Sequence, residues 1–264
     1  MAIERAPAEP GFELQPNGDA AVDIRFFAEP SAALSETIIS LAESINANTI
    51  TGVTELVPAY QCLTVCYNPL QLTCASDGTP GVSKLRRVLA AITEKALAQN
   101  TPSQRERYLI RIPVCYHDDF ALDMRALCAH TGLTPKEVIS RHTAPSYLVH
   151  MLGFTPGFLY LGGLDQGLYC PRKARPALRV PAGSVGIGGS QTGIYPQATP
   201  GGWQVIGRTP LALFRPQQEP AYIAHPLDQV QFFAISKNDF SGIDPFSAPE
   251  QISLRQASSE AKKP

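Results

Sequence analysis

Residues 179–196 read Arg179-Val-Pro-Ala-Gly183-Ser-Val-Gly-Ile-Gly-Gly-Ser-Gln191-Thr-Gly-Ile-Tyr195-Pro196. Glycine and proline interrupt the apolar residues so often that no helical period can develop. The same pattern extends over residues 146–235, with short apolar runs at 147–152, 185–187, 203–206, 211–214 and 230–235. Many short strands separated by turn residues predict a closed β barrel.

The segment that precedes this region contains one strand and two helices. Alternating apolar residues predict a strand over 108–112, which Pro113 is expected to end. A helix is predicted over 120–130. A second helix begins with Thr134-Pro-Lys-Glu, which combines the spacing of a capping box with proline at the first helical position.

The first hundred residues follow a different plan, in the order strand, strand, helix, strand, strand, helix. This order predicts two helices packed on one face of an antiparallel sheet. A polar stretch over 99–105 is the expected linker. The fold class is therefore α+β, with an N-terminal α+β sandwich domain at 10–99, a β-barrel domain at 105–240 and a polar, flexible tail at 241–264.

Composition excludes several classes of protein. The formal net charge is −1, from 22 basic and 23 acidic residues, which is not typical of a nucleic-acid-binding protein. No apolar run is long enough to span a membrane, and the first ten residues lack the apolar core of a signal peptide. The six cysteines show no zinc-ligand spacing, so no metal site is expected. We therefore expect a cytoplasmic protein.

Standard catalytic signatures are missing from the glycine-rich window. Gly186-Ile-Gly188-Gly189 lacks the third glycine of a dinucleotide loop, and Tyr195-Pro196 follows where a helix should begin. The sequence contains no phosphate-binding P-loop and no His-Glu-x-x-His motif. A nucleotide site within this chain is therefore not recognised.

Polar and aromatic side chains nevertheless concentrate around these glycines. Arginine binds carboxylate or phosphate through paired hydrogen bonds, and a neutral histidine can transfer protons. Tyrosine and glutamine can donate to a carbonyl oxygen, and tryptophan can form a pocket wall. Each residue also has an ordinary structural explanation, as a solvated charge or as part of the core. The residues concerned are His142, His150, Tyr160, Arg172, Lys173, Arg175, Arg179, Gln191, Tyr195 and Trp203.

Taken in order, these segments resemble a known family. The run His-x-x-x-x-Tyr-x-Val-x-Met-Leu-Gly-Phe-x-Pro-Gly-Phe-x-Tyr-Leu-Gly-Gly-Leu, from His142 to Leu164, is similar to the B-type subunit of 5-oxoprolinase. The same family includes the kinase inhibitor KipI and allophanate hydrolase subunit 1. The segments that begin at Pro181, Gln191 and Pro200 fit the same pattern.

The resemblance implies a cyclophilin-like C-terminal barrel and a role as one subunit of a complex. With a homologous C-type subunit and an A-type subunit, such a protein would use ATP to hydrolyse the lactam of 5-oxoproline to glutamate, and it would be inactive alone. By analogy, His142, Gln191 and Tyr195 are the expected catalytic residues. The small anionic amide substrate is expected to contact Tyr160, Arg172, Arg179, Trp203 and Arg208.

Two other functions fit the same motif. One is a regulatory protein that inhibits a sensor histidine kinase. The other is a subunit that acts on allophanate or another urea-derived amide. The sequence leaves all three open, although a glycine-rich barrel with clustered Arg, Gln and Tyr favours a small anionic ligand.

Overall fold

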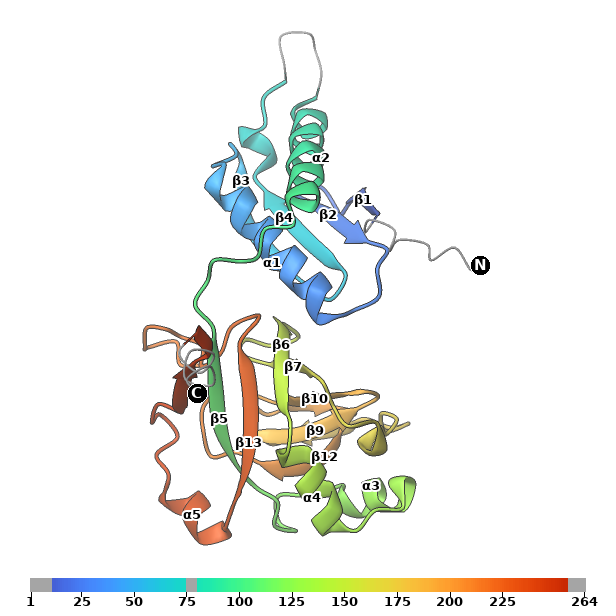
Figure 1. Cartoon of the computed structure of the whole chain (residues 1–264), viewed down its shortest axis with the longest axis vertical. Helices are drawn as coiled ribbons and strands as arrows, with labels where there is room; N and C mark the ends of the chain where they lie inside the picture. Colours follow the sequence, from blue (N-terminus) through green and yellow to red (C-terminus); the bar gives the residue numbers. More distant parts are fainter. Residues whose placement is uncertain (1–10, 75–79, 256–264) are drawn as a thin grey trace, which may run out of the picture. The chain divides into compact units, whose positions relative to one another are not determined.

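The computed structural model describes residues 11–74 and 80–255. The chain divides into two units, Met1–Arg105 and Glu106–Pro264 (Figure 1). Each unit has its own hydrophobic core. The first ten residues, where no signal peptide is expected, lie outside the described residues, as do residues 256–264 of the predicted tail. No helix in the described part of the chain is both long and apolar enough to cross a lipid bilayer.

The N-terminal unit is a four-stranded antiparallel sheet in the order β1-β2-β4-β3, with helices on one face. Alternation buries Val22, Ile24 and Phe26 of one central strand against the helices. The first helix begins where the Ser31 side chain accepts a hydrogen bond from the Leu34 amide. The elements are β1 (Phe12–Pro16), β2 (Ala21–Phe26), α1 (Ala32–Ala47), β3 (Val53–Pro58), β4 (Cys62–Tyr67), η1 (Pro69–Gln71) and α2 (Gly81–Gln99).

The C-terminal unit is a closed barrel. Seven strands follow one another in the order β12-β9-β10-β7-β6-β13-β5, and a bridge between β12 and β5 closes the ring. Its strands are β5 (Tyr108–Cys115), β6 (Ser146–Leu152), β7 (Leu159–Gly162), β9 (Ser184–Gly188), β10 (Gln191–Ile194), β12 (Gln204–Arg208) and β13 (Gln229–Ile235). The predicted α+β fold with a C-terminal barrel is confirmed.

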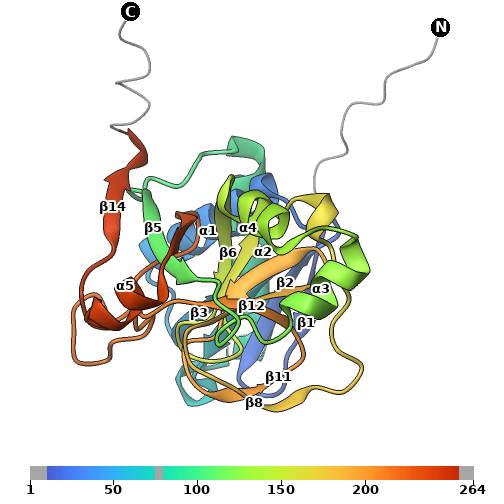
Figure 2. The ribbon, with the colours of Figure 1, turned by 90° about the horizontal axis from the view of Figure 1, so that it is seen from below.

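Smaller elements complete this unit. A two-stranded ribbon, β8 and β11, lies outside the main sheet, and β14 pairs with β5 beside the ring (Figure 2). The capping box of Thr134 and Glu137 is formed as predicted. These elements are α3 (Met124–Thr131), α4 (Pro135–Thr143), η2 (Gln166–Leu168), β8 (Ala177–Val180), β11 (Thr199–Gly201), α5 (Lys237–Gly242) and β14 (Glu250–Ser253).

Four sequence-based expectations need correction. Strand β5 continues through Pro113, because this residue falls between the part paired with β14 and the bridge from Cys115 to Arg208, where no donated hydrogen bond is needed. The helix expected from Phe120 begins at Met124, after a turn. The run 211–214 is a buried loop with one β-bridge.

The fourth correction concerns the tail. Residues 241–255 do not form a flexible segment, since β14 adds antiparallel to β5. Arg111 of β5 contacts Glu250 of β14 at 3.1 Å. The buried Arg215 guanidinium donates to the Ser247 carbonyl at 2.8 Å. The polar composition that suggested flexibility is that of a solvent-exposed edge strand.

Candidate functional site

The candidate site lies on the outer face of the barrel wall formed by β7, β10 and β9. Side chains alternate along these strands, so Leu161, Thr192 and Ile187 point into the barrel. The outward positions next to them include Gly186 and Gly188 on β9 and Gly193 on β10. Without side chains there, the outer surface of the wall forms a flat floor.

The indole of Trp203 occupies this floor. A Cβ at Gly188 would lie 2.6 Å from three ring atoms of Trp203, and one at Gly193 would lie 2.9 Å from the same ring. The glycines are therefore required by the close approach of the ring to the backbone, rather than by a turn. They explain why a strand-forming region contains so many residues that weaken strands.

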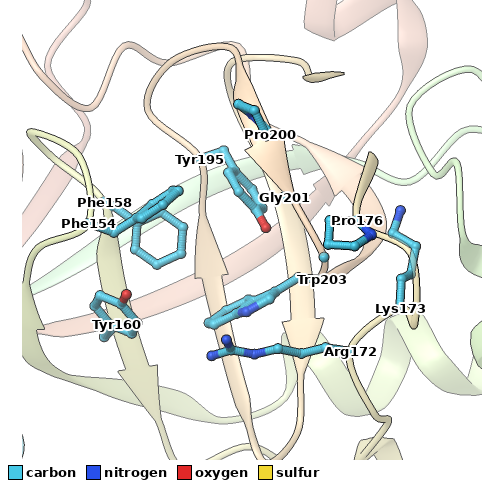
Figure 3. Close-up of a pocket in the computed structure, with 11 residues that line it drawn as sticks. Phe154, Phe158, Tyr160, Arg172, Lys173, Pro176, Tyr195, Pro200, Gly201 and Trp203 are labelled. Atoms are coloured by element: carbon cyan, nitrogen blue, oxygen red, sulfur yellow. The ribbon is translucent and has the colours of Figure 1, made fainter. Parts of the chain in front are cut away.

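Other aromatic rings stand around the indole. Phe158 meets Tyr195 at a centroid distance of 5.3 Å and Trp203 at 5.5 Å, both edge to face. The ring centroids of Tyr160 and Trp203 are 6.2 Å apart. These rings line a cavity of about 310 Å³ (Figure 3). A pocket of this size with apolar walls suits a small molecule.

Two cations complete the lining. The Arg172 guanidinium carbon lies 5.6 Å from the centroid of the Trp203 ring, a cation–π arrangement. Lys173 donates its backbone amide to the Gly202 carbonyl at 2.6 Å, and its Nζ contacts Asp123 Oδ2 at 2.6 Å. Within the described part of the chain, no carboxylate side chain lines the cavity. The cavity therefore favours an anionic ligand with a flat or apolar body.

The two tyrosines are hydrogen-bond donors at neutral pH. Burial raises the pKa of Tyr195 and of Tyr160, and the nearby charge of Arg172 opposes the rise in both. Both phenols therefore stay protonated. A protonated phenol can donate to a carbonyl oxygen of a ligand.

The structure brings together four of the eight predicted site residues. Tyr160, Arg172, Tyr195 and Trp203 line the cavity. Gln191 is half-buried at the start of β10. It lies on the same outer face of the strand as Gly193, but it does not line the cavity.

The two remaining arginines lie elsewhere. Arg179 is exposed on β8. Arg208 lines a separate cavity of about 480 Å³, where its Nε donates to the Ala182 carbonyl at 2.7 Å. Its guanidinium carbon lies 6.0 Å from the ring centroids of Phe120 and Phe240. Neither arginine is placed to share a ligand with Arg172.

His142 requires the largest correction, because it is completely buried inside the barrel. Its Nε2 lies 3.0 Å from Thr192 Oγ1, which itself donates to the Gly186 carbonyl. The threonine hydroxyl must therefore accept from Nε2–H, which leaves Nδ1 to accept from Tyr116 at 2.8 Å. Burial lowers the pKa of His142 to about 3. A fully bonded, neutral imidazole without access to the cavity supports the core rather than proton transfer.

Three residues outside the eight predicted ones matter for the site, because Phe158 and Lys173 line the cavity and Asp123 forms an ion pair with Lys173. Phe158 lies just before β7 and two residues from Tyr160, so the period of two could have identified it. Lys173 was visible only as part of a basic run. Asp123 lies 50 residues away in the chain, and no local pattern connects it with Lys173. Among the described residues, no group of three or more His, Cys, Asp or Glu side chains is placed to hold a metal ion.

The glycine floor gives a first prediction. We expect Gly188→Ala to destabilise the protein by about 1–3 kcal/mol, because the new methyl group would collide with the indole ring. Trp203 is the only tryptophan, so its fluorescence should shift to longer wavelength as the ring moves into solvent. Urea unfolding and emission spectra would measure both effects.

Gly242→Ala is the matched control, since a Cβ there meets no atom within 4 Å. Equal stability and unchanged emission for both alanine variants would contradict the role of the floor.

Comparisons with known proteins agree with this architecture. The family model described as "Carboxyltransferase domain, subdomain C and D" matches residues 12–224. The B-type subunit of 5-oxoprolinase from Bacillus subtilis is 39% identical over 230 residues, which cover 87% of this chain and 95% of the relative.

Two solved structures share the fold. The structure of TTHA0988 matches with a TM-score of 0.68 and 32% identity, over 82% of this chain and 40% of that chain. This chain thus spans less than half the length of TTHA0988. The urea amidolyase of K. lactis matches with a TM-score of 0.74 at 15% identity, over 98% of this chain and 17% of that chain, which indicates a common fold alone.

The resemblance drawn from the motifs at 142–164 and 181–210 is therefore confirmed. The family match extends over both structural units. The chain belongs to the family of the carboxyltransferase domain, subdomain C and D, among relatives that are named as the B-type subunit of 5-oxoprolinase.

Proposed function

We propose that this chain is the B-type subunit of a cytoplasmic, ATP-dependent 5-oxoprolinase complex and that its outer cavity binds the lactam substrate. The observation that carries the proposal is the convergence of Arg172, Lys173, Tyr160 and Tyr195 around the Trp203 ring. The names of its relatives support the reaction. The complex would also contain a homologous C-type subunit and an A-type subunit.

The chemistry of 5-oxoproline matches this lining. Its single carboxylate can accept paired hydrogen bonds from the exposed Arg172 guanidinium. Its flat ring can lie against Trp203. The lactam oxygen then needs a donor, which the protonated hydroxyl of Tyr195 or Tyr160 supplies. This chain would thus bind and orient the substrate.

ATP is a co-substrate in the proposed reaction. Transfer of the terminal phosphoryl group of ATP to the lactam oxygen, with release of ADP, would make the ring carbon electrophilic. Water could then add to this carbon, and cleavage of the C–N bond with loss of inorganic phosphate would give glutamate. The eleven residues that line the cavity come from strands and loops, and none begins a helix. This lining includes Gly201 and Gly202 but not the helix N-terminus that, together with a glycine-rich loop, usually holds phosphates. We therefore assign ATP binding to another part of the complex.

The same reasoning assigns the general base to a partner. The histidine expected to transfer protons is buried and bonded on both ring nitrogens. The cavity is lined by neutral tyrosines and by cations, none of which accepts a proton readily at neutral pH. This chain alone should therefore be inactive.

The test measures glutamate released from 5-oxoproline and ATP. The chain would be assayed alone, then with its A-type and C-type partners. Activity in the full mixture and none with the chain alone is the expected result. An assembled complex that releases no glutamate would overturn the proposal, and activity on allophanate or inhibition of a histidine kinase would then identify the alternative.

Binding can be measured separately from turnover. Trp203 is the only tryptophan, and it lines the cavity. Titration of the isolated chain with 5-oxoproline should therefore change its fluorescence and saturate. Pyrrolidin-2-one, the same ring without the carboxylate, should bind more weakly. Equal responses to the two compounds would contradict a carboxylate contact.

A further inference from the structure

The two cations of the cavity differ in their electrostatic surroundings. Lys173 forms an ion pair with Asp123, with 2.6 Å between Nζ and Oδ2, and the two side chains are only 22% and 17% exposed. Among the described residues, no ion pair joins Arg172 to a carboxylate. The cavity therefore carries one compensated and one uncompensated positive charge.

Asp123 is held firmly in place. Its Oδ2 also accepts a hydrogen bond from the Val205 amide at 2.8 Å, and its own amide donates to the Val205 carbonyl at 2.8 Å. Asp123 precedes α3 but makes no side-chain cap with that helix. Its carboxylate thus bonds to the backbone of β12 and to the Lys173 side chain.

The negative charge of Asp123 also affects a residue that lines the cavity. It contributes to raising the pKa of Tyr195, beside the larger effect of burial. Removing this carboxylate would therefore change the potential within the cavity, as well as releasing Lys173.

We infer that Asp123 determines the charge selectivity of the cavity, so that it accepts a ligand with one carboxylate and rejects one with two. This inference rests on the proposed function, because it assumes that the cavity binds the substrate. With Lys173 neutralised, a second carboxylate would find no free cation and would lie near Asp123. Repulsion between this second carboxylate and Asp123 would discriminate against ligands with two carboxylates.

The consequence for catalysis is a difference between substrate and product. The closed lactam has one carboxylate, and opening the ring creates a second carboxylate and an ammonium group, for which no carboxylate among the described residues lines the cavity. The cavity would bind the opened product less well than the closed ring. This weaker binding would favour release of the product from the cavity.

Glutarate is the probe for the second carboxylate, since it has as many heavy atoms as 5-oxoproline. For the wild-type chain, Trp203 fluorescence should report tighter binding of 5-oxoproline than of glutarate. Asp123→Asn keeps an oxygen for the Val205 amide and frees Lys173. The affinity for glutarate relative to 5-oxoproline should then rise about tenfold, the effect expected of one unit charge beside a partly solvated pocket.

Two further variants make the test specific. Glu250→Gln removes a carboxylate from the surface pair with Arg111 and should leave the ratio unchanged. Asp123→Asn combined with Lys173→Met removes both members of the pair, so the ratio should return towards the wild-type value.

The outcomes separate this inference from the proposed function. A wild-type chain that binds neither compound at Trp203 would overturn the cavity as a substrate site, and the inference with it. If 5-oxoproline binds but Asp123→Asn leaves the ratio unchanged, or if Glu250→Gln raises it equally, only the role of Asp123 is refuted.

Discussion

Arg172→Met is expected to weaken the binding of 5-oxoproline about thirtyfold, or by about 2 kcal/mol, a typical loss for a charge-assisted contact. Methionine retains an apolar stem beside the Trp203 ring, so the change removes mainly the charge. Arg172 is exposed to solvent, which limits the effect. Fluorescence titration of the isolated chain measures the affinity. In the assembled complex, KM should rise more than kcat falls, as expected for a contact made equally in the ground and transition states.

Two comparisons show whether the charge is responsible. Arg179→Met removes an exposed arginine of β8 that does not line the cavity, and it should bind 5-oxoproline like the wild type. Pyrrolidin-2-one should bind the wild type and Arg172→Met equally. A thirtyfold loss for this uncharged ring too would mean that Arg172 acts by supporting the indole, and the carboxylate contact would be refuted.

The fold was largely predictable because its signals are local. Alternating apolar residues predicted β2 and β4, short apolar runs predicted β6 and β13, and the capping box predicted the start of α4. Strands β7 and β10 escaped notice because glycines interrupt their apolar pattern. Their glycines permit close contacts between segments that are separate in the sequence, since a Cβ at Gly193 would lie 2.7 Å from the Leu159 carbonyl oxygen. Such contacts have no local signature.

The site was predictable only in part, for the same reason. Residue type and the glycine-rich context selected the cavity residues Tyr160, Arg172, Tyr195 and Trp203. They did not show which wall of the barrel each residue faces. His142 and Arg208 carry suitable chemistry, yet the closure of the barrel directs them into the core and into a different cavity.

The buried position of His142 makes the stability of the barrel dependent on pH. In the unfolded chain its pKa returns towards 6.5, while in the folded protein it is about 3. Between these values the unfolded state binds more protons than the folded state. Folding stability therefore falls as pH decreases from about 6.5 towards 3, by about 1.4 kcal/mol per pH unit for this one group.

His142→Gln should remove this dependence. Glutamine can still donate to Thr192, but the buried Tyr116 hydroxyl loses its acceptor, at a cost of about 1–3 kcal/mol at neutral pH. Between about pH 7 and about pH 5, we expect the wild type to lose about 2 kcal/mol more stability than the variant. Urea unfolding at both pH values measures the difference.

His130→Gln provides the control for a general effect of histidine loss, because His130 is exposed at the end of α3. Burial also lowers the pKa of His150, but this residue is present in every variant, so its contribution cancels in the comparison. Parallel pH profiles for the wild type and His142→Gln would mean that the imidazole binds protons equally in both states. The neutral chain from Tyr116 through His142 to Thr192 would then be wrong, and a role for this histidine in proton transfer would have to be considered again.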